Sequence, residues 1–204
     1  MIDDVFDYWY FNDPLVSSEE IKHLNKIINE RYSRLEPVED GALGNDGNYL
    51  KNIKPKIVNF KDIRQEIHHV IDFAYLRCHY HFGFTTYPVN SWDTLLYNEY
   101  TSDIKGKYGE HHDSSRSLYF DTKMTFLLNL SEDYYEGGDF IVNGETQDFF
   151  REPGTAILFK SNLLHQVTPV TSEKCRILVT LNYNLEKDIE LSENARLTFF
   201  GRIN

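Results

Sequence analysis

From Trp92 onward the sequence is divided into short apolar runs by turn-forming residues, and this pattern limits the fold more than any other feature. Dipeptides such as Gly137-Gly138 and Pro153-Gly154 separate the runs. The runs, four to eight residues long, are DTLLYNEY, SLYF, MTFLLNL, DFIV, TAILF, HQVTPV and RILVTLNY. Strands this short, at this spacing, are typical of an antiparallel sandwich or barrel and not of alternating strand and helix units.

The first part of the chain shows helical periodicity instead. Ser17 and Glu20 have the spacing of a capping box, which predicts a helix that ends near Arg31. A second helix is expected over about 60–76, and the segment 36–55, rich in Gly, Asn and Asp, is expected to form a long loop. The apolar positions of the two helical stripes are Ile21, Leu24, Ile27 and Ile28, then Ile63, Ile67, Val70, Ile71 and Ala74.

These patterns predict a mainly β fold with flanking helices, organised as one domain over residues 1–204. Residues 1–90 are expected to form a mainly helical support layer and residues 91–184 the β core. Residues 185–204 are expected to be a C-terminal extension.

The balance of charge restricts the partners. The formal net charge is -11, which disfavours nucleic acid and anionic lipid because both select basic surfaces, but which permits neutral or basic peptides and divalent cations. Two cysteines cannot form a disulfide framework, and no basic-apolar leader or membrane-length apolar run is present, so we expect a cytoplasmic protein.

One histidine motif points to a metal. In His111-His112-Asp113, residues i and i+2 of a strand share a face, so His111 and Asp113 would aim at one point while His112 faces away. A third ligand should come from another strand, and His165, 54 residues downstream, opens the run HQVTPV. Two His and one carboxylate on one face of a metal form the facial triad of non-haem Fe(II) oxygenases.

Such a site needs a co-substrate for its open positions. A 2-oxo acid can chelate iron through its keto oxygen and the adjacent carboxylate. If it has a second carboxylate at its other end, an arginine guanidinium can bind that group with two parallel hydrogen bonds. Arg176, which begins the run RILVTLNY, is the candidate; the alternative is an arginine at a strand end that extends to the surface.

Several ordered blocks resemble the Fe(II)/2-oxoglutarate dioxygenases of the prolyl 4-hydroxylase type. The similarity is close over residues 92–184, and the segment FNDPLVSSEEIKHL resembles the usual entry into that family's first helix. The blocks are Tyr100…Tyr108-Gly-Glu-His-His-Asp113, Lys123-Met-Thr-Phe-Leu-Leu-Asn-Leu, Glu136-Gly-Gly-Asp-Phe140, Pro153-Gly-Thr-Ala-Ile-Leu-Phe159, His165-Gln-Val-Thr-Pro-Val-Thr171 and Arg176.

This resemblance implies a double-stranded β-helix, or jelly roll, with the N-terminal helices packed on the major sheet. It implies His111, Asp113 and His165 as iron ligands, Arg176 as the partner of the 2-oxoglutarate carboxylate and Tyr100 as a tyrosine that reaches the co-substrate. The segment after Tyr100 and the turn before Arg176 look slightly long, which leaves Tyr97 and Lys174 as alternatives.

The implied cofactors are Fe(II), 2-oxoglutarate and O2, with ascorbate as a candidate reductant. The implied reaction is hydroxylation of a C–H bond, with a prolyl residue in a peptide or protein as the expected substrate and succinate and CO2 as products. A free amino acid or small metabolite is the alternative substrate, and a non-catalytic jelly-roll binding module is the non-enzymatic alternative. The sequence does not predict an oligomeric state.

The segments that flank the predicted metal strand are the candidates for substrate specificity, because loops beside a rigid site usually contact the substrate. They are residues 101–107 and 114–122, the second of which contains Arg116, Tyr119 and Phe120.

Overall fold

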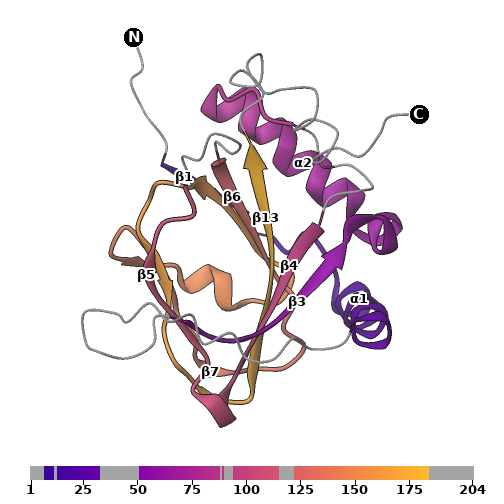
Figure 1. The fold of residues 1–204 in the computed structure, drawn as a ribbon, viewed down its shortest axis with the longest axis vertical. Helices are drawn as coiled ribbons and strands as arrows, with labels where there is room; N and C mark the ends of the chain where they lie inside the picture. Colours follow the sequence, from indigo (N-terminus) through magenta and orange to yellow (C-terminus); the bar gives the residue numbers. More distant parts are fainter. Residues whose placement is uncertain are drawn as a thin grey trace, which may run out of the picture.

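Two facing antiparallel sheets form the body of the molecule (Figure 1). The structure, a computed structural model, describes residues 7–11, 13–32, 51–87, 89, 94–114 and 122–183. The major sheet has the order β1 (Tyr8–Tyr10), β10 (Ala156–Lys160), β6 (Thr122–Asn129), β13 (Lys174–Tyr183), β4 (Thr94–Thr101) and β3 (Lys54–Asn59). The minor sheet has the order β2 (Lys51–Asn52), β5 (Lys107–His111), β11 (His165–Val167), β8 (Phe140–Val142) and β9 (Glu145–Thr146).

Shorter elements complete the described fold. Strands β7 (Glu136–Gly137) and β12 (Val170–Ser172) pair with each other, and three 3-10 turns are η1 (Phe60–Asp62), η2 (Ser102–Ile104) and η3 (Asp148–Arg151). The mainly β class predicted from the short apolar runs is therefore confirmed.

The two helices cover the outer face of the major sheet, as predicted (Figure 1). Helix α1 (Ser18–Arg31) begins at Ser17, whose side chain and that of Glu20 form the expected capping box. Helix α2 (Arg64–Phe82) is longer than predicted because its buried side continues to Cys78, and it ends at Gly83, which has a positive φ of 69°. No described helix has the length and apolarity that a membrane span requires.

One core lies between these helices and the sheet. It contains the following buried side chains of α1, α2 and the outer sheet face: Ile21, Leu24, Ile28, Ile67, Val70, Ile71, Ala74, Cys78, Leu95, Tyr97, Met124, Phe126, Leu128, Ala156, Leu158 and Leu178. A second core lies between the two sheets and includes Tyr100, Leu127, Phe140, Phe159, Val167 and Ile177.

The N-terminal segment contributes more strand than predicted. Part of the expected loop over 36–55 forms β2 and the start of β3. Strand β2 pairs with β5 and β3 pairs with β4, so each strand depends on a partner 35 to 57 residues away. Local composition does not show such long-range pairing, and β1 likewise pairs with the distant β10.

Candidate metal centre

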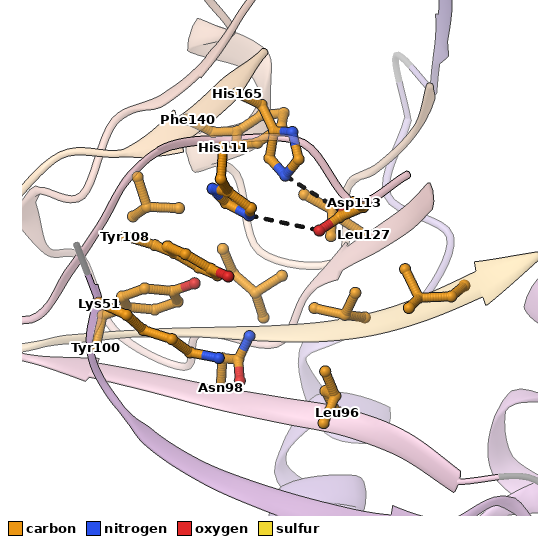
Figure 2. Close-up of a pocket in the computed structure, with 14 residues that line it drawn as sticks. Lys51, Leu96, Asn98, Tyr100, Tyr108, His111, Asp113, Leu127, Phe140 and His165 are labelled. Carbon is orange, nitrogen blue, oxygen red and sulfur yellow. Dashed lines mark ion pairs between the residues drawn. The ribbon is translucent and has the colours of Figure 1, made fainter. Parts of the chain in front are cut away.

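Three predicted ligands converge between the sheets, at one side of a cavity (Figure 2). His111 ends β5, His165 begins β11, and the antiparallel pairing of these strands places the two residues opposite each other. Asp113 follows two residues after His111, and the nearest ligand atoms of the three residues lie within 4.8 Å of one another. His112 is exposed, as the alternation of a strand predicts.

Backbone carbonyls orient both imidazoles. Nδ1 of His111 lies 2.8 Å from the Gly109 carbonyl oxygen, and Nδ1 of His165 lies 3.1 Å from that of Leu163. A proton on Nδ1 that is donated to these carbonyls leaves Nε2 with its lone pair. The two Nε2 atoms lie 3.4 Å and 3.3 Å from the carboxylate oxygens of Asp113.

The carboxylate of Asp113 is held by its own contacts. The Thr125 hydroxyl donates to Oδ2 at 2.9 Å, and Ser161 lies 3.0 Å from the same hydroxyl. The carbonyl of Ser161 also accepts the backbone N–H of Asp113. Burial alone would raise the pKa of Asp113, but the neighbouring side chains of His111 and His165 hold that pKa well below its usual range.

Aromatic rings pack against the histidines. The Tyr108 ring stacks on His111 with 3.5 Å between ring centroids and 9° between planes. The Phe159 ring meets His165 edge-on at 4.8 Å. These contacts restrict ring rotation, so the histidines are pre-organised to present Nε2 inward.

The donor set fits a divalent first-row metal. Two imidazole nitrogens and one carboxylate oxygen converge, their outer atoms are already hydrogen-bonded, and the arrangement matches the facial triad that leaves positions open for other ligands. In the described part of the chain, these three residues are the one cluster of His, Cys, Asp or Glu side chains whose ligand atoms lie close enough together to hold a metal ion.

The cavity beside the triad is mixed in character (Figure 2). Its apolar wall comes from Leu96, Leu127, Phe140, Val167, Ile177, Val179 and Leu181. Its polar lining, besides the triad, comes from Lys51, Asn98, Tyr100 and Tyr108.

Strand alternation separates the two tyrosines that the sequence left as alternatives. Tyr100 faces the cavity together with Asn98 and is 2% exposed. Tyr97 faces the helices, where its hydroxyl donates to Asn25. The structure therefore brings Tyr100, and not Tyr97, to the candidate site.

Arg176 lies elsewhere, which corrects the expectation that it meets the co-substrate. Ile177 and Val179 line the cavity, so Arg176 is on the opposite face of β13. Its guanidinium donates to Glu99 at 3.1 Å and to Glu132 at 2.9 Å. Lys174, the alternative, shares the face of Arg176 and does not line the cavity either.

Sequence reasoning missed several residues of this site. Thr125 lies within a predicted strand, but its contact with Asp113 depends on how two strands pack. Lys51 falls within the segment expected to form a loop, and its approach to the cavity follows from the pairing of β2 with β5. The specificity candidates Arg116, Tyr119 and Phe120 lie outside the described residues.

Comparison with known proteins is consistent with this geometry. A sequence model of the 2OG-Fe(II) oxygenase superfamily matches residues 95–184. A PKHD-type hydroxylase from Colwellia psychrerythraea is 35% identical over 86 residues, which cover 39% of this chain and 38% of that protein. The chain spans less than two fifths of the length of the curated relatives that it matches.

Solved structures share the fold. A Pseudomonas putida prolyl-4-hydroxylase aligns with a TM-score of 0.65 at 13% identity, over 87% of this chain and 92% of that one. A Trichoplax adhaerens prolyl hydroxylase, in complex with a hypoxia inducible factor oxygen degradation domain peptide fragment, aligns with a TM-score of 0.65 at 15% identity. That alignment covers 92% of this chain and 88% of the other. The likeness confirms the predicted double-stranded β-helix.

Proposed function

We propose, from the match of residues 95–184 to the 2OG-Fe(II) oxygenase superfamily, that the protein is an Fe(II)- and 2-oxoglutarate-dependent dioxygenase that hydroxylates a prolyl residue of a peptide or protein. The family uses Fe(II), 2-oxoglutarate and O2. The observation that carries the proposal is the convergence of His111, Asp113 and His165 beside a cavity.

In this proposal the three side chains hold the iron. When bound, Fe(II) would supply the site where 2-oxoglutarate and O2 react, so that oxidation of 2-oxoglutarate to succinate and CO2 is coupled to insertion of one oxygen atom into a C–H bond. Thr125 keeps Asp113 in place, and the carbonyls of Gly109 and Leu163 keep Nε2 of each histidine directed at the metal.

The cavity wall supports an apolar reacting group. Leu96, Val179 and Leu181 line the cavity and would exclude water from a reacting carbon. The prolyl assignment is supported by the names of the similar proteins, which include a PKHD-type hydroxylase and prolyl hydroxylases. The net charge of -11 favours a neutral or basic peptide as the substrate.

The test measures succinate formed from 2-oxoglutarate with Fe(II) present and then withheld, together with peptide mass. Neutral and basic proline-containing peptides are compared with matched peptides in which alanine replaces proline. The expected result is Fe(II)-dependent succinate and a gain of one oxygen atom on the proline-containing peptide. Oxidation of free amino acids but of no peptide would instead support a small-molecule substrate.

Two neighbouring variants supply the matched control. Asp113→Ala removes one predicted ligand and should abolish both Fe(II) binding and turnover, whereas His112→Ala alters an exposed side chain and should preserve both. Equal loss in the two variants would refute the assignment of the ligands. Folded wild-type protein that binds Fe(II) and forms no succinate with any peptide or amino acid would refute the enzyme proposal.

A further inference from the structure

The cavity has a polar end that lies away from the triad. Figure 2 shows the Lys51 side chain reaching toward Asn98 beneath Tyr100 and Tyr108, on the far side of the cavity from the triad. The ammonium of Lys51 lies 4.8 Å from the centroid of the Tyr108 ring. Lys51 is the one lysine or arginine among the described residues that line this cavity.

Asn98 gives this end a second recognition group. Its side chain is 4% exposed, and within the described part of the chain its Oδ1 has no hydrogen-bond partner. A buried amide oxygen without a partner carries a free-energy cost, which a ligand that bonds to this amide would remove. Because the amide can rotate, it can direct its NH2 group toward an anion.

Tyr100 supplies a third group. Its ring is 2% exposed and lines the cavity, and burial raises the pKa of its hydroxyl well above the usual value. The hydroxyl therefore stays protonated and can donate a hydrogen bond. The lining of this end thus offers an ammonium, an amide and a phenol as hydrogen-bond donors.

Apolar side chains line the same cavity as this polar end and the triad. They include Leu127, Ile177 and Val179. A ligand that fits has an anionic head at one end, a short apolar middle, and a metal-chelating group at the other end. This is the chemistry of a 2-oxo dicarboxylate.

We infer that Lys51, Asn98 and Tyr100 bind the far carboxylate of 2-oxoglutarate, so that a lysine from β2 takes the part that the sequence suggested for Arg176. The inference rests on the proposed function, since it concerns the same metal site. Lys51 lies outside the residues 95–184 matched by the superfamily, so this chain recruits its cation from the N-terminal segment.

The test compares two ligands by calorimetric titration into Mn(II)-loaded protein without O2, so that no turnover contributes. 2-Oxoglutarate is compared with 2-oxovalerate, which has the same carbon chain but ends in a methyl group. Wild-type protein should bind 2-oxoglutarate about 10- to 100-fold more tightly, as expected for hydrogen bonds to a charged group. Lys51→Met should remove that preference without weakening 2-oxovalerate, and Lys51→Arg should retain part of it.

Lys54→Met is the matched control, because Lys54 pairs with Asp103 at 2.7 Å and does not line the cavity. It should keep the preference of wild type. If Lys51→Met, folded and metal-loaded, discriminates between the two acids as well as wild type does, the inference is wrong while the proposed function stands. If wild-type protein binds neither acid, the proposed function itself fails, and this inference with it.

Discussion

Replacing Arg176 tests whether this residue stabilises the fold, as its contacts indicate, or binds the co-substrate. Arg176 is 8% exposed, and its guanidinium donates to Glu99, which is 1% exposed, and to Glu132. Its backbone N–H donates to the Ser131 hydroxyl at 3.0 Å. Glu132 also accepts from Asn25 of α1 at 2.8 Å, so the network ties that helix to β13.

Arg176→Met keeps much of the side-chain length but removes the cation between two carboxylates. Removal of one partner from a buried ion pair costs about 3–5 kcal/mol, because the remaining charge stays in a poorly solvated place. For a domain of this size such a loss lowers Tm by about 6–20 °C. We therefore expect a folded but much less stable protein, with little change in its affinity for 2-oxoglutarate at low temperature.

The assay combines thermal or urea unfolding with titration of 2-oxoglutarate into the Mn(II)-loaded variant well below its Tm. A double-mutant cycle with Glu99→Gln isolates the pairwise term, and the double variant should be more stable than the sum of the single losses predicts. An Arg176→Met protein that unfolds within about 2 °C of wild type, while its affinity for 2-oxoglutarate falls tenfold or more, would show that Arg176 binds the co-substrate instead.

Three further predictions follow from other contacts. Thr125→Val removes the hydroxyl that donates to Asp113 and should weaken Mn(II) or Fe(II) binding by about 10- to 100-fold, measured by metal titration, whereas Thr125→Ser should not. Burial raises the pKa of the Cys175 thiol from 9.0 to about 11. The unfolded chain therefore loses this proton first, and the stability that the neutral thiol contributes should be lost as the pH rises from about 9 to about 11. Cys175→Ala should flatten that part of a pH series of urea unfolding, and an unchanged slope would contradict the reasoning. Gly137→Ala should lower Tm because Gly137 has a φ of 67° and an added Cβ would lie 2.1 Å from the Pro169 carbonyl oxygen; an equal Tm would mean that this turn relaxes freely.

Local patterns are sufficient for the two helices, for the mainly β character of the later part of the chain and for the spacing of the metal ligands. The capping box at Ser17 predicted the start of α1, and alternation along one strand predicted that His111 and Asp113 face inward while His112 is exposed. These features depend on neighbours within a few residues, where the period of a helix or a strand decides which face a side chain takes.

Which charged residue lines the cavity depends on tertiary structure. Arg176 and Cys175 are adjacent in sequence, and either side of β13 could have faced the cavity until pairing with β4 and β6 set which face is inside. Lys51 approaches the cavity because β2 crosses to the minor sheet and pairs with β5, a contact between distant parts of the chain.

The sequence by itself therefore determined the mainly β class, the two helices and the three candidate ligands, because periodicity and spacing are local properties. Only the tertiary structure decided which charged residue meets the cavity, because a shift of one residue in register moves a side chain to the opposite face of the sheet. That rule places Arg176 in a buried network beneath α1 and leaves the cation at the cavity to Lys51.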